Sequence, residues 1–260
     1  MAESERAGES GAPAANMIEV RGLRKSFGGR EVLKGIDLAM KAGTTNVILG
    51  GSGSGKTVLM KHLIGLLKPD AGDVLVEGES IVRLGGRELA RVRHKFGMVF
   101  QAAALFDSMT VFDNVAFPLR EHTRKRETEI ARIVHEKLEV VGLKDIDGRY
   151  PAELSGGMKK RVGLARAIAL EPKIVLYDEP TTGLDPITTD YVDEMILAAK
   201  RQLGVTSVVI SHDIGSAMNI ADHIAFLHEG RICEQGSPDV LRNSVHPAVS
   251  RFMATWRGKR

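Results

Sequence analysis

The chain has 260 residues, of which 43% are hydrophobic and 27% are charged, and this is enough apolar material to bury one or two globular cores. No apolar run approaches the roughly eighteen residues of a membrane-spanning helix. Cys233 is the only cysteine, which excludes an internal disulfide and a metal site built on several thiolates, and we expect it to be a buried thiol. A net charge of +3 does not by itself select nucleic acid or a membrane surface as a partner.

The first part of the chain predicts a tail followed by strands. Residues 1–16, MAESERAGESGAPAAN, are rich in Glu, Gly, Ala and Ser and lack an apolar targeting segment, so we expect a disordered tail. Loose apolar alternation from Ile18 to Met40, around the turn FGGRE, predicts antiparallel strands. A buried strand TTNVILG and a helix from Thr57 follow, and then a hairpin in GDVLVEGESIVRL and a strand in KFGMVFQ.

Helical periodicity dominates the middle of the chain. Apolar residues recur three or four positions apart in VFDNVAFPLREH, ETEIARIVHEKLEVVGL and GMKKRVGLARAIAL, which predicts three α-helices. Short apolar strands then return in KIVLYDE and TSVVISHD, separated by the helix TTDYVDEMILAAKRQLG, which is the βαβ pattern of a parallel sheet. After Ser237, which is placed to cap the helix PDVLRN, the chain ends in the partly apolar HPAVSRFMATWRGKR.

These elements predict an α/β fold with a mixed sheet, an antiparallel β subdomain and an inserted α-helical subdomain. The core is expected at residues 17–103 and 173–236, the helical subdomain at 104–172, and a C-terminal helical tail at 237–260.

A phosphate-binding loop is predicted in ILGGSGSGKT, because Gly50, Gly55, Lys56 and Thr57 fit the pattern G-x-x-x-x-G-K-[ST] between a strand and a helix. Glycines let consecutive N–H groups converge on an anion, and the helix N-terminus adds partial positive charge. Lys56 would reach the β/γ-phosphates, and the Thr57 hydroxyl would coordinate Mg²⁺. The alternative is a glycine-rich turn that only connects the two elements. The expected binding residues are Gly50, Gly51, Ser52, Gly53, Ser54, Gly55, Lys56 and Thr57.

Two acids end the apolar strand IVLYDEP. Asp178 is placed to hold Mg²⁺, and Glu179 is placed to take a proton from an attacking water. A kinase with a hydroxyl substrate would not need the glutamate in this form, so the pair favours hydrolysis. The alternative is that both acids cap the next helix.

Three further polar positions add weaker signals. Ser155 and the glycines of LSGGM precede a helix and form a second helix start suited to an anion. Gln101 ends the strand MVFQ, and His212 follows VVIS, both at the edge where a doubly wound sheet binds its ligand. An isolated Gln or His at a strand end is more often a structural residue, so only the complete set promotes them.

The segments GGSGSGKT, Gln101, LSGGM, IVLYDEP, TTGLD and SHD, in this order, resemble the ATP-binding cassette family of phosphate-loop (P-loop) NTPases over about residues 18–236. The resemblance implies a head-to-tail homodimer with ATP and Mg²⁺ held between the phosphate loop of one copy and the LSGG segment of the other. It assigns Phe27 to the adenine, Gln101 to Mg²⁺ and the attacking water, Lys56 to the phosphates, Glu179 to the general base, His212 to the γ-phosphate, Asp185 to contact across the interface, and Ser155, Gly156 and Gly157 to the second copy's nucleotide. For Phe27, a buried strand aromatic remains the alternative. Met158 departs from the usual Gln after LSGG, which removes an amide near the nucleotide and implies a tuned site.

The segment FQAAALFDSMTVFDNVAFPLREHT is unusually apolar for a surface. Together with LSGGMKKR, ARAIALEP and LDPIT, it resembles the ATPase subunit of Mla/Mce-type bacterial phospholipid transporters. That resemblance implies permease subunits bound through residues 101–122, often a small regulatory subunit, and a lipid-binding Mce-type protein. It places the chain peripherally on the cytoplasmic face of the bacterial inner membrane, driving lipid movement between that membrane and the outer envelope. Ordinary helical core is the alternative for each apolar residue of the segment.

Two other functions compete with this one. A soluble cassette ATPase of translation or DNA repair usually carries a second cassette, a coiled coil or a basic linker, and these features are not seen here, so no nucleic-acid partner is expected. A transporter of an amino acid, a peptide or a metal chelate remains open, because other subunits select the cargo.

Overall fold

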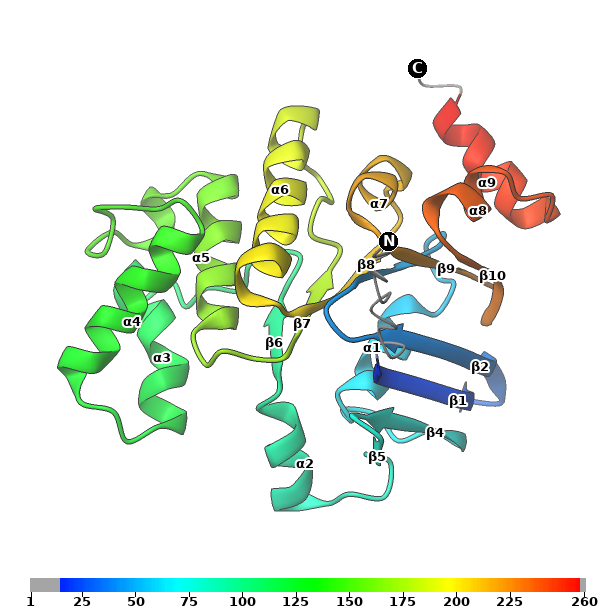
Figure 1. Ribbon diagram of the computed structural model, residues 1–260, viewed down its shortest axis with the longest axis horizontal. Helices are drawn as coiled ribbons and strands as arrows, with labels where there is room; N and C mark the ends of the chain where they lie inside the picture. The colour runs from blue at the N-terminus through cyan, green and yellow to red at the C-terminus, as the bar shows by residue number, and fades with distance from the viewer. Residues whose placement is uncertain (1–14, 258–260) are drawn as a thin grey trace, which may run out of the picture.

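A six-stranded sheet lies at the centre of the computed structural model, which describes residues 15–257 (Figure 1). Its strand order is β10-β9-β3-β8-β7-β6, and neighbouring strands are parallel except for the antiparallel pair β9 and β10. The strands are β3 (Thr45–Leu49), β6 (Phe96–Val99), β7 (Ile174–Asp178), β8 (Thr206–Ser211), β9 (His223–His228) and β10 (Arg231–Gly236).

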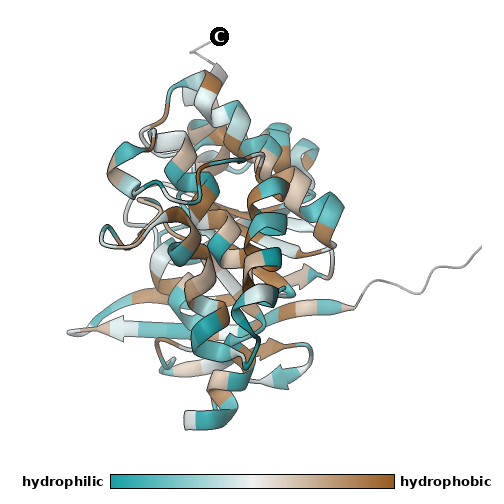
Figure 2. Cartoon of the chain, turned by 90° about the vertical axis from the view of Figure 1, so that its left-hand side faces the viewer, coloured by the Kyte–Doolittle hydropathy of each residue, from teal (hydrophilic) through white to brown (hydrophobic). Residues whose placement is uncertain are grey.

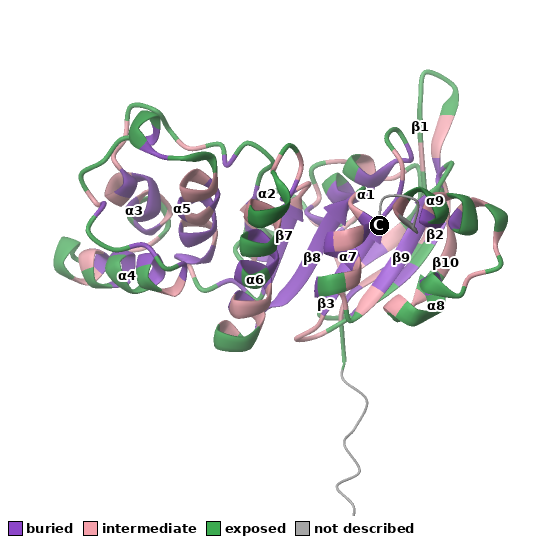
Figure 3. Ribbon diagram, turned by 90° about the horizontal axis from the view of Figure 1, so that it is seen from above, coloured by how far each residue is buried: buried purple, intermediate pink, exposed green. Residues whose placement is uncertain are grey.

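Both faces of this sheet are buried, as Figure 3 shows for its inner strands. Alternate residues of a strand point to opposite faces, and the two hydrophobic clusters follow that period. In β7, Val175 and Tyr177 belong to one cluster, and Ile174 and Leu176 belong to the other. This explains why the parallel strands appear in the sequence as continuous apolar runs.

A second, four-stranded antiparallel sheet packs beside the first in the order β2-β1-β4-β5. Its strands are β1 (Asn16–Phe27), β2 (Arg30–Lys41), β4 (Ala71–Val76) and β5 (Glu79–Ser80). The predicted hairpin is confirmed, although β5 is short because Ile81 turns inward to a position that is 2% exposed. Asn16 already belongs to β1, and residues 1–14 of the expected tail lie outside the described range.

The helices between residues 104 and 172 form a layer at one end of the molecule, drawn in green in Figure 1. They are α3 (Val111–His122), α4 (Glu127–Val140), the short 3-10 helix η1 (Pro151–Glu153) and α5 (Gly156–Ile168). Figure 2, in which this layer faces the viewer, shows hydrophobic and hydrophilic residues interspersed along the helices. The apolar side of each helix is buried, as the sequence period predicts.

The remaining helices connect or flank the strands. They are α1 (Lys56–Leu63), α2 (Gly86–Arg93), α6 (Pro186–Leu203), α7 (Ile214–Ile220), α8 (Pro238–Arg242) and α9 (Pro247–Arg257). Helix α2 was not expected from the sequence, because it is highly charged and buries only Val92. In residues 15–257, no helix combines the length and the apolar character needed to cross a bilayer.

Three local expectations need correction. Gln101 does not end its strand, because β6 stops at Val99 and Gln101 lies exposed in the following turn. Ser237 does precede α8, but its side chain makes no capping hydrogen bond. Cys233 is only half-buried, because it lies on the edge strand β10 and packs against the border of the larger hydrophobic cluster.

Candidate nucleotide-binding site

The predicted site residues converge because the strands that precede them are neighbours in the sheet. The phosphate loop follows β3, His212 follows β8, and Asp178 and Glu179 end and follow β7. Since β3, β8 and β7 are adjacent and parallel, their carboxyl ends lie at one edge. This is the edge at which open α/β sheets bind their ligands.

The phosphate loop needs glycine at particular positions. A Cβ on Gly50 would lie 2.3 Å from the Leu227 carbonyl oxygen, so no side chain fits there. Gly53 and Gly55 have φ of +74° and +110°, a backbone conformation that side chains disfavour. A Cβ on Gly51 would meet nothing within 4 Å, so the space beside this position is open. Gly55 caps α1 without a side chain, so the helix N-terminus is not covered by its own cap.

Lys56, Glu179 and His212 form a continuous polar chain across this edge. Lys56 Nζ donates to the carbonyl oxygens of Gly50 and Gly51 at 2.8 and 3.0 Å, and lies 3.5 Å from Glu179 Oε1. His212 Nδ1 lies 2.7 Å from Glu179 Oε2. Lys56 is 7% exposed, whereas the His212 side chain is 53% exposed, so the chain runs from the protein interior to the open edge.

Glu179 is held firmly by its surroundings. Its backbone N–H donates to the Ile210 carbonyl oxygen at 2.9 Å, and Thr182 Oγ1 donates to its carboxylate at 3.1 Å. Its φ of 49° is unusual for a residue with a side chain and marks a locally constrained backbone. Thr182 was not identified from the sequence, because no pattern marks the second residue of TTGLD as a functional one.

Asp178 suits a cation. Burial raises the pKa of its carboxyl group, the neighbouring charge of Glu179 raises it further, and Lys56 and Lys61 oppose both effects. A carboxylate in this environment gains from a nearby positive charge. Thr57 is exposed at the start of α1, and Gln101 is exposed in the turn after β6. Oxygen donors for Mg²⁺ are therefore available on this edge.

A cavity of about 580 Å³ adjoins the phosphate loop. Its walls are residues 51–54 of the loop, Arg30, Glu31, Val32 and Lys34 of β2, and the turn His228, Glu229 and Gly230. Phe27 is 46% exposed and pairs with Arg30 across the turn between β1 and β2, so it stands at the margin of this cavity. The buried alternative for Phe27 is therefore wrong. The turn after β9 was not identified from the sequence, and it lies at the site because β9 is the neighbour of β3 in the sheet.

The LSGG segment does not join the phosphate loop within one chain. Ser155 is the N-cap of α5, where its hydroxyl accepts from the Met158 N–H at 3.3 Å, and Ser155 and Gly156 are exposed. Among the described residues, none of this segment lines the cavity beside the loop. Asp185 caps α6 by accepting from the Thr188 N–H at 3.0 Å, and a Cβ on Gly157 would lie 3.5 Å from Thr188 Cγ2. The starts of α5 and α6 are thus neighbours.

Residues 101–122 combine core and surface. Val111, Val115 and Leu119 are buried, as the core alternative expected. Phe106 is 42% exposed and contacts Phe117, with ring centroids 4.9 Å apart. A groove of about 510 Å³ is lined there by Phe96, Met98, Phe100, Phe106, Phe117, Pro118 and nine further residues of α2, β6, α3 and α5 and their flanks, and Arg166 is among them.

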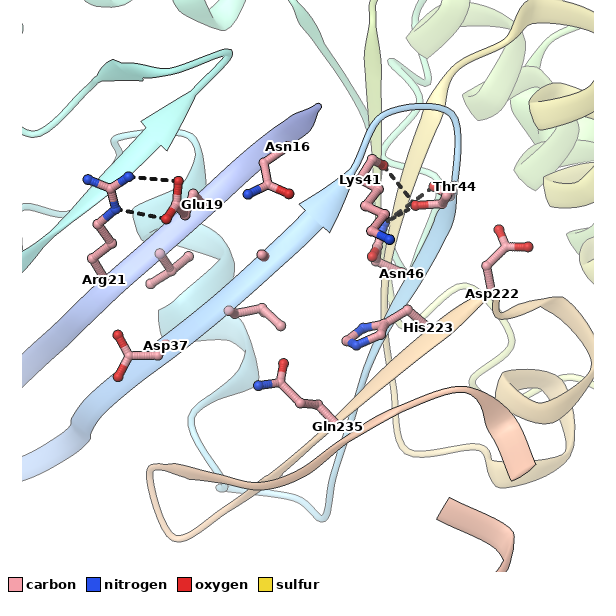
Figure 4. A pocket seen from close by; sticks show the side chains of 13 residues that line it. Asn16, Glu19, Arg21, Asp37, Lys41, Thr44, Asn46, Asp222, His223 and Gln235 are labelled. Carbon is pink, nitrogen blue, oxygen red and sulfur yellow. Dashed lines mark hydrogen bonds and ion pairs between the residues drawn. The ribbon is translucent and has the colours of Figure 1, made fainter. Parts of the chain in front are cut away.

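Another cavity, of about 690 Å³, lies at the opposite edge of the central sheet (Figure 4). It separates β1 and β2 from the starts of β3 and β9, where Asn46 and His223 lie. Some of its polar groups bond to one another, as Arg21 does to Glu19 and Asn46 to Thr44. No residue of the phosphate loop lines it, so it is distinct from the edge that carries that loop.

Comparison with known proteins agrees with this geometry. Residues 33–182 match the ABC transporter family. The chain is 44% identical to the probable ribonucleotide transport ATP-binding protein mkl of Mycobacterium tuberculosis, over 95% of this chain and 69% of that protein. It is 42% identical to the intermembrane phospholipid transport system ATP-binding protein MlaF of Escherichia coli, over 92% and 89% of the two chains. A dimeric, post-hydrolysis structure of the ATP-binding cassette MJ0796 with ADP and phosphate superimposes with a TM-score of 0.77 and 31% identity, over 85% of this chain and 99% of the other.

The fold and the site define a P-loop ATPase of the cassette type. The chain belongs to the ABC transporter family, in which it is an ATP-binding, ATP-hydrolysing subunit.

Proposed function

We propose that this chain hydrolyses ATP, as one half of a homodimer bound to membrane permease subunits, to drive phospholipid transport between the bacterial inner membrane and the outer envelope. The observation that carries the catalytic part is the chain of contacts joining Lys56, Glu179 and His212 at the carboxyl edge of the sheet. The cargo rests on similarity to MlaF, 89% of whose length the chain matches.

Each side chain then has a defined task in hydrolysis. Lys56 exchanges the carbonyl oxygens of Gly50 and Gly51 for the β/γ-phosphates, while the loop N–H groups bind the same anion. Glu179 accepts a proton from the attacking water, and His212, which contacts the same carboxylate, binds the γ-phosphate. Bound Mg²⁺ would be held by Thr57, Gln101 and Asp178 and would offset the phosphate charge. Phe27 stacks on the adenine at the margin of the cavity.

A dimer completes this site. The LSGG residues are exposed and lie away from the phosphate-loop cavity of their own chain, which supports their binding the nucleotide of a second copy. Ser155, Gly156 and Gly157 would do so, with Asp185 close to the interface. The solved cassette MJ0796 is dimeric, in agreement with this arrangement.

The groove at residues 101–122 is the proposed permease site. It is mostly apolar and formed by residues of α2, β6, α3 and α5, so a short helix of a membrane subunit fits its character. The chain would lie peripherally on the cytoplasmic face of the inner membrane. A small regulatory subunit and a lipid-binding Mce-type protein complete the proposed assembly, and no nucleic acid takes part.

The test is to isolate the chain with its native membrane partners and to identify the copurifying subunits and bound small molecules by mass spectrometry. We expect permease subunits loaded with phospholipid. A permease that holds an amino acid, or a ribonucleotide as the name of mkl suggests for that relative, would overturn the proposed phospholipid cargo. A soluble ribosomal or DNA-bound partner would overturn the transport role.

A further inference from the structure

Lys160 is a buried cation that the proposed chemistry does not use. It lies on the second turn of α5 and is 7% exposed, whereas its neighbours Lys159 and Arg161 are half-buried. Its Nζ donates a hydrogen bond to the carbonyl oxygen of Pro180, the residue that follows Glu179.

Stability does not account for a lysine at this position. Burial lowers the pKa of the Lys160 ammonium, and within residues 15–257 no carboxylate contributes an opposing effect. An ammonium buried against a single carbonyl oxygen is unfavourable compared with an apolar side chain of similar size. The contact with Pro180 is therefore the specific gain from having a donor here.

The loop that Lys160 holds carries the proposed general base. Pro180 has no N–H, so its carbonyl oxygen is the only backbone hydrogen-bonding group that this residue itself offers. The same loop includes the constrained backbone of Glu179 and the Thr182 hydroxyl that donates to the Glu179 carboxylate. A shift of the Pro180 carbonyl oxygen would change the direction of the Glu179 side chain.

The other end of this contact is the helix that begins with Ser155. The start of α5 also lies beside the first turn of α6, where a Cβ on Gly157 would be 3.5 Å from Thr188 Cγ2, and the Arg161 guanidinium lies 5.9 Å from the Tyr191 ring centroid. Helix α5 therefore lies against both ends of the segment between Glu179 and Asp185. Lys160 bonds to Pro180 at one end, and the start of α5 lies beside α6 at the other.

We propose that Lys160 is a positioning residue for ATP hydrolysis, which fixes the loop after Glu179 to the helix that carries the LSGG segment. Docking of that helix on the second copy's nucleotide would then set the direction of the general base in the chain's own site. This inference rests on the proposed function, in which Glu179 is the base and Ser155 acts on the partner's nucleotide.

The experiment compares steady-state ATP hydrolysis by the full chain and its Lys160→Met, Lys160→Arg, Lys159→Met and Glu179→Gln variants. Rates are expressed per chain able to bind nucleotide, counted by binding stoichiometry, so that unfolded protein does not lower kcat. We expect Lys160→Met to lower kcat by about tenfold or more with KM for ATP within about threefold, because the phosphate loop is untouched. Lys160→Arg retains a hydrogen-bond donor and should have most of the wild-type kcat. The matched control Lys159→Met should have the wild-type kcat.

Different results test the role of Glu179 as the base and the role of Lys160 as a positioning residue. Normal turnover by Glu179→Gln would overturn the proposed role of the base and, with it, this inference. If Glu179→Gln is inactive while Lys160→Met keeps kcat within about twofold, the inference alone fails. A loss in Lys160→Met that Lys160→Arg does not recover also overturns it. Should Lys160→Met not fold, Lys160→Gln takes its place, and unchanged kcat and KM in that shorter variant contradict the proposal.

Discussion

Glu179 is the residue on which the account of hydrolysis depends most. Its carboxylate lies between a buried lysine and an exposed histidine, and it accepts a hydrogen bond from Thr182. These contacts hold the carboxylate at the edge of the sheet before nucleotide binds. A base that is already oriented loses less entropy when the reaction begins.

The Glu179→Gln variant tests this role. Glutamine preserves the size of the side chain but cannot take a proton from water, so we expect turnover to fall by on the order of a hundredfold while ATP binding persists. Measurement of kcat together with equilibrium binding of ATP checks both parts. Turnover within about threefold of the wild-type rate would remove Glu179 from the base role.

At the scale of elements, Asp193 joins α6 to α7, the helices that follow Asp185 and His212. It is 3% exposed and accepts hydrogen bonds from Ser216 Oγ and, at 3.4 Å, from Asn219 Nδ2. Burial is the main cause that raises the pKa of Asp193 from 3.8 to about 6, and the charges of Asp213 and Asp190 add to it. The folded protein therefore binds this proton more tightly than the unfolded chain does.

Protonation of Asp193 should make the free energy of unfolding depend on pH. Because the folded-state pKa is raised, the favourable contribution is fully present below about pH 4 and is lost as the pH rises through about 6. The asparagine of Asp193→Asn does not titrate. Relative to the wild type, the free energy of unfolding of this variant should therefore increase by on the order of 1–3 kcal/mol between pH 4 and 7. Urea unfolding of both proteins across this range provides the measurement. A difference in free energy of unfolding that stays constant with pH would show that Asp193 does not titrate in this window.

The groove at residues 101–122 is the element that a membrane partner would occupy. Phe106→Ser removes an exposed ring from its wall, and we expect recovery of permease subunits in copurification to fall by about fivefold or more. Val245→Ser removes a side chain that is 93% exposed between α8 and α9 and serves as the control. Equal recovery with both variants would place the permease on another surface.

Elements with a strong period could be predicted from the sequence, and contacts between distant elements could not. Continuous apolar runs identify β3, β7 and β8, since both faces of that sheet are buried. The turn after β9 reaches the phosphate loop only because β9 pairs with β3, which no local pattern encodes. Likewise, nothing in LSGGMKKR separates the buried Lys160 from the more exposed Lys159, because only the packing of α5 distinguishes them.

The whole molecule presents two half-sites that do not share the cavity beside the phosphate loop. One comprises the phosphate loop, Glu179 and His212, and the other comprises the start of α5 with Ser155. Neither half-site alone surrounds a nucleotide, so two copies in opposite orientation would complete two equivalent sites. Turnover should then depend on association of the chain as well as on ATP concentration.

The most direct measurement is turnover per chain, at saturating ATP and Mg²⁺, over about a hundredfold range of protein concentration, with sedimentation recording the fraction of dimer. The account predicts that turnover per chain falls on dilution in proportion to that fraction and approaches zero for the monomer. A sample that sediments wholly as monomer yet hydrolyses ATP at the full rate would contradict it.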